Sequence, residues 1–264
     1  MTVDSIELPH RWQGAGEPLV LIAGLGGKGT SWQPFLERAT RSYRVLTFDN
    51  PGAGGTPPLS GPVSIRAMAR SVNALLERLG VSHAHVVGRS MGGMIAQELA
   101  LLAPDRVRRL ILVSTCARVD AHLTRVFRLW ARMARSGVPL ELRHESSMLW
   151  CLGHESLASS ARVRAYLQTR GSADRPRDYA RQAEACAQHD ALDRLHALQV
   201  PTLVVAGTDD RLMPAWHAET LAKAIPGAQL GRVPGAGHLP YLEQPELFAR
   251  CVLRFLGGEG AGDE

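Results

Sequence analysis

The chain has few cysteines, and none of them lie close together in the sequence. Its 264 residues contain four, with no C-x-x-C spacing: Cys116, Cys151, Cys186 and Cys251. A disulfide framework or a structural zinc site requires clustered cysteines. The histidines and carboxylates show no metal-ligand spacing either. We therefore expect reduced thiols and no bound metal.

Long apolar runs are also missing. No stretch has the roughly 20 consecutive apolar residues that a helix needs to cross a bilayer. Residues 1–7 have neither the basic nor the apolar segment of a secretory signal. We expect a cytoplasmic protein with no membrane partner.

The chain also lacks clusters of basic residues. The net charge is +5, but only Lys28 and Lys223 are lysines, and no basic run resembles a nucleic-acid patch. No nucleic-acid partner is expected. Residues 118–181 hold more arginines than acids. They form either a surface that attracts an anionic substrate or, as we favour, a solvated helical face.

What is present is enough apolar material for a core, since 45% of the residues are hydrophobic and 21% are charged. Short apolar runs alternate with helical patterns through both ends of the chain. The runs expected to form strands are 6–12 at an edge, then 18–23, 43–48, the run ending at 87, 107–113, 202–206 and 229–233. The stretches expected to form helices are one capped by Thr30 or Ser31, then 65–79, 91–102, 214–224 and 245–255. This alternation predicts a mainly parallel sheet flanked by helices.

The middle of the chain breaks this alternation. From about residue 120 to residue 190 there are helical stripes, such as Leu123, Phe127 and Trp130, but no convincing strand. We therefore predict one α/β core domain, residues 1–117 and 196–264, with residues 118–195 inserted as a helical cap. Trp130 and Trp150 either line a pocket under this cap or belong to its core.

Residues 88–92 read Gly-Arg-Ser-Met-Gly and lie between a buried run and a helical pattern. In this strand–turn–helix setting, G-x-S-x-G is the nucleophile-elbow pattern, which predicts that Ser90 is a nucleophile. Small residues at both ends permit a tight turn. The start of a helix favours developing negative charge. The alternative is a glycine-rich turn that carries a surface serine.

A serine nucleophile needs a base, and the base needs an acid to orient it. Asp210 and His238 each follow a predicted strand, and in open α/β sheets functional groups gather at the carboxyl ends of strands. The order Ser90, Asp210, His238 is the one expected of an α/β-hydrolase. Asp209 and Asp120 are the alternative acids; we assign a turn or capping role to Asp209.

Beyond these residues, the chain resembles the α/β-hydrolase superfamily over nearly its whole length. The resemblance depends on the motifs at 24–27, 49–54, 88–93, 104–114, 207–214 and 237–238. Within the superfamily the chain is most similar to the 3-oxoadipate enol-lactonase and small carboxylesterase branch. The resemblance implies an α/β-hydrolase fold and an oxyanion hole formed by the backbone N–H groups of Leu25 and Met91.

Two positions depart from the family pattern. Ala23 stands where the family often has a histidine that braces the oxyanion loop, which puts the loop geometry in question. Arg89 stands where His, Asn or Gln is more common. We expect Arg89 to be paired beside the elbow; contact with an anionic substrate is the alternative.

Together these features predict a serine hydrolase that cleaves a small carboxylic ester or lactone through an acyl-enzyme. A cofactor-free lyase, cyclase or C–C bond hydrolase that uses the same three residues is the alternative, and a ligand receptor that keeps the fold is a third. Residues 24–27 do not form G-x-G-x-x-G, so we expect no dinucleotide and no other cofactor. The expected partner is a small-molecule ester or lactone, with a homodimer as a further possibility.

Overall fold

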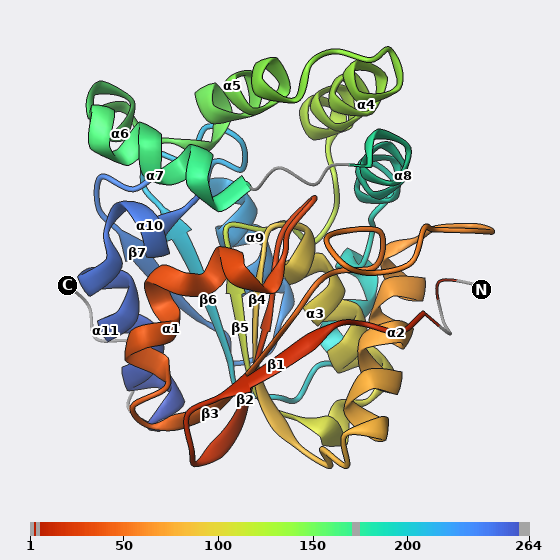
Figure 1. Cartoon of the computed structure of the whole chain (residues 1–264). Coiled ribbons are helices and arrows are strands. Elements are labelled where there is room, and N and C mark those ends of the chain that lie inside the picture. The colour runs from red at the N-terminus through yellow and green to blue at the C-terminus, as the bar shows by residue number, and fades with distance from the viewer. Residues whose placement is uncertain (1–2, 4–5, 171–174, 259–264) are drawn as a thin grey trace.

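A computed structural model describes residue 3 and residues 6–170 and 175–258. Within these ranges one sheet has the strand order β1-β3-β2-β4-β5-β6-β7, and every neighbouring pair is parallel except β1 with β3 (Figure 1). The strands are β1 (His10–Gln13), β2 (Glu17–Ile22), β3 (Tyr43–Phe48), β4 (Ala84–Arg89), β5 (Val107–Val113), β6 (Thr202–Gly207) and β7 (Gln229–Val233). The predicted α/β-hydrolase fold, a mostly parallel sheet flanked by helices, is confirmed.

Helices cover both faces of this sheet. In Figure 1, α1 and α11 lie on one face, and α2 and α3 lie on the other. The helices of this lower part are α1 (Gln33–Ala39), α2 (Ile65–Arg78), α3 (Met91–Leu102), α9 (Ala215–Ala224), α10 (Pro240–Glu243) and α11 (Pro245–Leu256). Three short 3₁₀ helices join them, namely η2 (Gly29–Trp32), η3 (Pro104–Arg106) and η4 (Leu192–Ala197).

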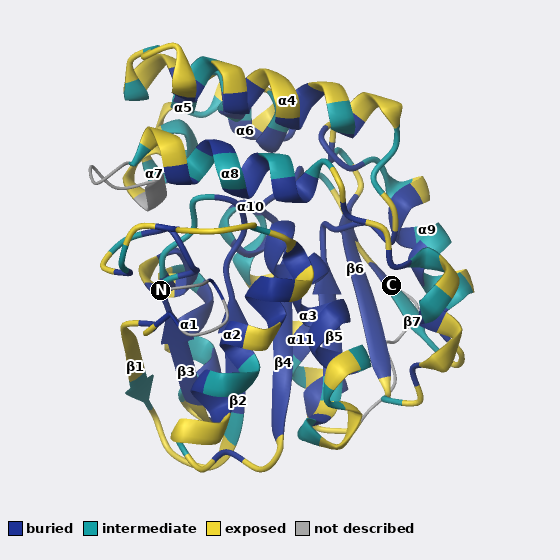
Figure 2. Ribbon diagram, turned by 90° about the vertical axis from the view of Figure 1, so that its right-hand side faces the viewer, coloured by how far each residue is buried: buried dark blue, intermediate teal, exposed yellow. Residues whose placement is uncertain are grey.

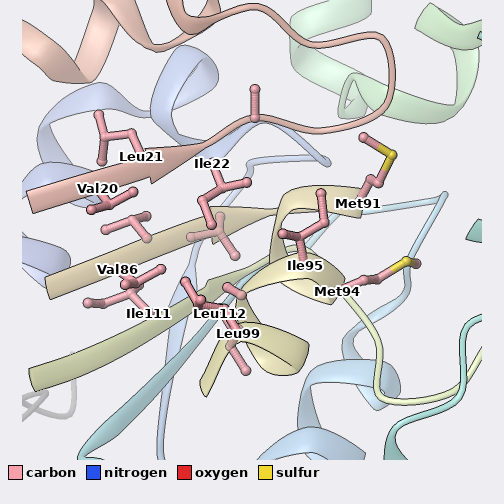
Figure 3. Close-up of a cluster of buried hydrophobic side chains, with 14 of the residues drawn as sticks. Val20, Leu21, Ile22, Val86, Met91, Met94, Ile95, Leu99, Ile111 and Leu112 are labelled. Carbon is pink, nitrogen blue, oxygen red and sulfur yellow. The ribbon is translucent and has the colours of Figure 1, made fainter. Parts of the chain in front are cut away.

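The core lies between the central strands and their flanking helices. Strands covered on both faces have no solvent side, so their sequences are continuous apolar runs rather than alternating ones. Figure 2 shows β4, β5 and β6 buried along most of their length. Figure 3 shows side chains of β2, β4 and β5 meeting those of α3, including Val86, Leu112 and Ile95. This core holds β4 and α3 rigidly on either side of Ser90.

Among the described residues, five α-helices lie between β5 and η4, and they stand together over the top of the sheet (Figure 1). These upper helices are α4 (Ala121–Arg135), α5 (Leu140–Cys151), α6 (His154–Ala158), α7 (Ser160–Arg170) and α8 (Pro176–Cys186). Figure 2 shows α4 and α5 alternating between buried and exposed residues, as expected for amphipathic helices on a surface. None of the helices in the described ranges is long and apolar enough to cross a membrane.

The upper helices join the sheet domain through a two-stranded neck. The Val119 amide donates to the His189 carbonyl at 3.0 Å, and the Ala191 amide donates to the Ala117 carbonyl at 2.8 Å. Arg118 and Asp190 face each other across the neck, with Nε and Oδ2 2.7 Å apart. The chain thus leaves and re-enters the sheet domain at one place.

His189 is buried in this neck, and its burial gives a testable acid sensitivity. Loss of hydration lowers the pKa of His189 from 6.5 to about 4, against the opposing effect of nearby Glu98 and Asp190; the charge of Arg194 adds to the lowering. Between these two pKa values the unfolded chain binds a proton that the folded chain does not. The His189 contribution to stability is therefore complete above pH 6.5 and is lost as the pH falls towards 4, by about 3 kcal/mol.

We expect the free energy of unfolding to depend less steeply on pH in His189→Gln than in the wild type. The measurement is urea unfolding at several pH values between 7 and 4.5. His85 and His217 are also buried with lowered pKa values, so only the difference between wild type and variant reports on His189. His83→Gln, at an exposed position, is the matched control. If the free energy of unfolding changes with pH equally in the wild type and in His189→Gln, His189 is not the source of the acid sensitivity.

Two local predictions were wrong. The expected edge strand 6–12 is shifted to His10–Gln13, because Pro9 has no N–H for a strand ladder, although its carbonyl accepts from Asp49. Thr30 and Ser31 do not cap a helix. They lie in η2, and the Ser31 hydroxyl donates to the Lys28 carbonyl instead. The second error arose at a short polar segment where side chain and backbone compete for hydrogen bonds.

Candidate active site

Ser90 lies at a strained turn between β4 and α3. Its backbone has φ 56° and ψ −123°, a conformation that is costly for a residue with a Cβ. A Cβ on Gly88 would lie 2.3 Å from the Gly92 carbonyl oxygen, and one on Gly92 would lie 2.1 Å from that of Ile22. Only glycine fits at these two positions, which explains the spacing of the sequence motif.

Neighbouring groups hold the Ser90 backbone in this conformation. Its amide donates to the Val113 carbonyl at 2.9 Å, and the Thr115 hydroxyl donates to its carbonyl at 2.8 Å. Met91 is the first residue of α3, so its own amide is one of the four at a helix start with no acceptor within the helix. The turn therefore presents a serine hydroxyl beside a free N–H and the positive end of a helix dipole.

Asp210 and His238 are brought together from the ends of β6 and β7. Their Oδ2 and Nδ1 atoms are 2.9 Å apart, and both side chains are almost completely buried. The other carboxylate oxygen of Asp210 accepts the amides of Leu212 at 3.0 Å and Met213 at 2.8 Å. These bonds fix the carboxylate, and the carboxylate fixes the orientation of the imidazole ring.

The outer nitrogen of the same ring has no partner. His238 Nε2 is buried and makes no hydrogen bond with any described residue, including Ser90. Nucleophile–base contacts are often long in a free enzyme and tighten when substrate binds. The nitrogen is therefore available to accept a proton from a group that enters the site.

The alternative acids have other contacts. Asp209 accepts the His154 amide at the start of α6, which agrees with a capping role. Asp120 accepts the Leu123 amide at 2.7 Å and so caps α4, and its other oxygen is 4.0 Å from His217. Of the three candidates, Asp210 is the one bonded to His238.

The loop that carries Leu25 is braced from two directions. Asn50 Nδ2 donates to the Ala23 carbonyl at 2.7 Å and to the Gly24 carbonyl at 3.2 Å. Gln182, fully buried in α8, accepts the Gly26 amide at 2.8 Å and donates to the Pro51 carbonyl at 2.7 Å. These two amide side chains support the loop in a chain that lacks the usual histidine.

Comparison with known proteins identifies the family of the chain. A family profile described as the alpha/beta hydrolase fold matches residues 17–245. The chain belongs to the α/β-hydrolase family. An Azorhizobium caulinodans protein that carries the name carbamate hydrolase RutD is 33% identical over 253 residues, covering 95% of each chain.

Two solved structures superpose closely on this hydrolase. An esterase from Thermogutta terrifontis, with malate bound, has a TM-score of 0.87 at 31% identity and covers 96% of this chain and 94% of its own. The enol-lactonase from Burkholderia xenovorans LB400 has a TM-score of 0.88 at 26% identity, with coverage of 96% and 97%. The resemblance to the esterase and lactonase branch is thereby confirmed.

One buried carboxylate that sequence reasoning missed holds the loop around His238. Glu243 is 1% exposed, and one of its oxygens accepts the amides of Gly237 at 3.0 Å and Leu239 at 3.2 Å, on either side of His238. The other oxygen accepts the Gly153 amide, between α5 and α6, at 2.8 Å. Glu243 thus fastens the histidine loop to the upper helices.

The same turn between α5 and α6 makes two further contacts with the loops below it. The His238 amide donates to the Cys151 carbonyl at 2.8 Å, and Asp209 accepts the His154 amide as described above. All of these bonds use backbone groups of the upper helices. No sequence pattern considered above points to them.

The two tryptophans proposed for a pocket have different surroundings. Trp130 is 5% exposed, its ring is 6.0 Å from that of Phe127, and its indole N–H is buried without an acceptor among the described residues. Trp150 is half-buried, with its ring 5.3 Å from the His122 ring. The contacts of Trp130 are those of a core residue, whereas Trp150 is partly accessible.

The remaining candidate groups lie in other surroundings. Burial raises the pKa of the Cys116 and Cys186 thiols, which keeps them protonated. Among residues in the described ranges, no three histidines, cysteines or acids come together as candidate metal ligands. Arg89 has no ion-pair partner in that part of the chain, so the expected pairing beside the elbow is wrong.

Proposed function

We propose that this hydrolase cleaves small carboxylic esters or lactones with Ser90 as the nucleophile, His238 as the base and Asp210 as the orienting acid. The observation that carries the proposal is the buried Asp210–His238 pair at 2.9 Å together with the strained serine at the start of α3. Relatives that carry the names of an esterase, an enol-lactonase and a carbamate hydrolase are consistent with attack on an acyl carbon.

In the proposed reaction, Ser90 Oγ attacks the acyl carbon while His238 Nε2 takes the hydroxyl proton and then delivers it to the leaving oxygen. Water repeats these steps on the acyl-enzyme and releases the acid. Asp210 holds the imidazole in the tautomer that leaves Nε2 free, and stabilises the imidazolium that forms. The unpartnered Nε2 fits this role.

The negative oxygen of the intermediate needs N–H donors that are already in place. We assign this role to the amides of Met91 and Leu25; each such donor is worth roughly 3–4 kcal/mol in the barrier. The bracing of the Leu25 loop by Asn50 and Gln182 supports the assignment, since a donor is useful only if its position is fixed.

The experiment that tests the function is a substrate panel of nitrophenyl esters, lactones, a carbamate and a vinylogous C–C substrate, with product analysis. We expect hydrolysis of short esters or lactones, with an initial burst of alcohol as the acyl-enzyme forms. Cleavage of the C–C substrate alone would favour a C–C hydrolase. A product acid that has gained no oxygen atom from water would favour a lyase.

Gln182→Leu tests the oxyanion loop. The change leaves the Gly26 amide without its acceptor, and we expect kcat to fall roughly 10- to 100-fold because the Leu25 amide moves. KM should change much less, since the substrate body is not contacted. Gln188→Leu, at an exposed position just beyond α8, is the matched control and should leave both constants unchanged.

We also propose that the upper helices act as a cap over Ser90 that sets substrate choice. Trp130→Ala and Trp150→Ala are expected to shift kcat/KM among acyl chains of different size by roughly 10- to 200-fold, and to alter nitrophenyl acetate turnover little. Selectivity profiles and melting temperatures of both variants are the measurement. If kcat/KM falls equally for all substrates and the melting temperature also falls, that tryptophan belongs to the interior of the cap.

A further inference from the structure

A large cavity lies between the upper helices and the loop that joins β3 to α2. Its volume is about 750 Å³, and it is bordered by the end of α4, the start of α8 and, from the loop, Pro58 and Leu59. Figure 1 shows α4 and α8 side by side above this loop. Small-molecule sites have volumes of roughly 300–1,000 Å³. The cavity therefore has room for a whole small molecule rather than for a single ion.

The walls of this cavity carry an excess of positive charge. Four arginines and one acid border it, namely Arg135, Arg175, Arg177, Arg181 and Asp178. Glu184 pairs with the first of these arginines, and Asp178 Oδ2 lies 3.2 Å from Nε of the second. Within the described ranges, no carboxylate lies within ion-pair distance of Arg177 or Arg181. Two positive charges in the wall are therefore uncompensated.

Arg181 is already fixed beside the cavity by the loop below α8. Its guanidinium donates to the Leu59 and Gly61 carbonyls. These two bonds leave three of its five N–H groups for other acceptors. A carbonyl oxygen carries no net charge, so the arginine keeps its full positive charge. An arginine held in this way loses little side-chain entropy when it binds an anion.

The start of α8 adds to the positive potential of the cavity. The helix begins at Pro176, and the side chain of its N-cap residue, Arg175, makes no capping bond. The next two residues, Arg177 and Asp178, also border the cavity, and amides at these positions have no acceptor within a helix. The positive end of an 11-residue helix therefore adjoins the same space as the two uncompensated arginines.

The cavity and the oxyanion loop lie on opposite sides of α8. Arg177 and Arg181 are four residues apart, so they share one face of the helix. Tyr179 lies on the opposite face, since each residue turns the helix by about 100°. On that side, a Cβ on Gly26 would be 3.1 Å from the Tyr179 ring. The cavity is thus separate from the surroundings of Ser90, and what it binds is independent of the proposed function.

We propose that this cavity binds a small organic molecule through its phosphate monoester group. A phosphate monoester has a charge of about −1.5 to −2 at pH 7, which matches the two uncompensated arginines. Its oxygens accept the parallel hydrogen bonds of a guanidinium fork and the free amides at a helix start. Pro58, Leu59 and Ala134 give the cavity an apolar wall for the organic part of the molecule.

Calorimetry at constant ionic strength, with phenyl phosphate as the probe, tests the ligand class. We expect phenyl phosphate to bind the wild-type protein, and methyl phenyl phosphate, which has a single charge, to bind at least about 10-fold more weakly. Inorganic phosphate should also bind more weakly, because it leaves the apolar wall uncovered. Equal binding of the two phenyl compounds would contradict a site for a dianion. Equal binding of inorganic phosphate and phenyl phosphate would contradict a site for an organic molecule.

Variants test the location of the site. Arg177→Met removes an exposed side chain and should raise the Kd of phenyl phosphate about 10-fold, and adding Arg181→Met should raise it roughly 100-fold in total. Arg181→Lys keeps the charge but not the fork, and replaces Arg181→Met if the double variant does not fold. Arg128→Met, an exposed position on α4 away from the cavity wall, is the matched control and should leave the Kd unchanged. An unchanged Kd in Arg177→Met, or an equal rise in Arg128→Met, would overturn the proposal.

Discussion

Ser90→Ala is expected to abolish turnover, by roughly 10⁶-fold, while leaving the fold intact. Only one hydroxyl is lost, and the Ser90 backbone stays fixed by the Val113 carbonyl and the Thr115 hydroxyl. Activity towards the best substrate of the panel and the melting temperature are measured together. In the wild type, a fluorophosphonate probe should label Ser90, located by peptide mass spectrometry.

A matched control is available in Ser114. This serine is also buried, also has a positive φ, of 45°, and follows the neighbouring strand β5. Ser114→Ala should keep wild-type labelling and turnover. Label found on Ser114, or full activity in Ser90→Ala, would mean that the elbow serine is not the nucleophile.

Asp210→Asn is expected to lower kcat by about 10⁴-fold with little change in fold. The asparagine amide offers an N–H to His238 Nδ1, which selects the tautomer with the proton on Nε2. That nitrogen can then no longer accept the serine proton. The measurement is kcat as a function of pH for the variant and the wild type on one ester.

Asp209→Asn is the paired control, since it changes the same charge one residue away. The asparagine oxygen can still accept the His154 amide, so the turn next to α6 is kept. We expect a far smaller loss of activity. If Asp209→Asn were the more damaging change, Asp210 would not be the acid.

The sequence predicts those parts of the site that follow from local geometry. Ser90 is recognised because a buried run, a tight glycine turn and an apolar helix adjoin each other in the chain. Asp210 and His238 are found because parallel strands end at one edge, so residues that follow different strands meet there. These rules connect distant residues through the topology alone.

The supporting contacts could not be predicted in this way. Gln182 and Gly26 are 156 positions apart, and their contact depends on how α8 packs on the loops below it. The sequence does indicate that Gln182 is buried, because it shares one face of α8 with Asp178 and Cys186 at intervals of four. A polar side chain on such a face needs a buried partner, but the sequence does not say which.

Arg89 is a case in which the sequence predicts a contact that the structure does not contain. An arginine inside a buried strand is normally paired, so pairing was the reasonable expectation. Whether a carboxylate stands opposite depends on side chains from α10 and η2, and there the chain supplies Tyr241 and Trp32 instead. The absence of a partner is visible only once these elements are packed together.

The turn between α5 and α6 has a consequence for exchanging parts between relatives. The Cys151 carbonyl and the Gly153 amide hold the histidine loop, directly and through Glu243, and the His154 amide binds Asp209. These are backbone groups that almost every amino acid provides. The path of the main chain is therefore constrained there, while most side chains on the upper helices are free to differ. A chimaera that takes its upper helices from another hydrolase should keep His238 in place if the donor turn follows the same path and has a glycine at the position of Gly153, where a Cβ would lie 3.0 Å from the Gly237 amide nitrogen.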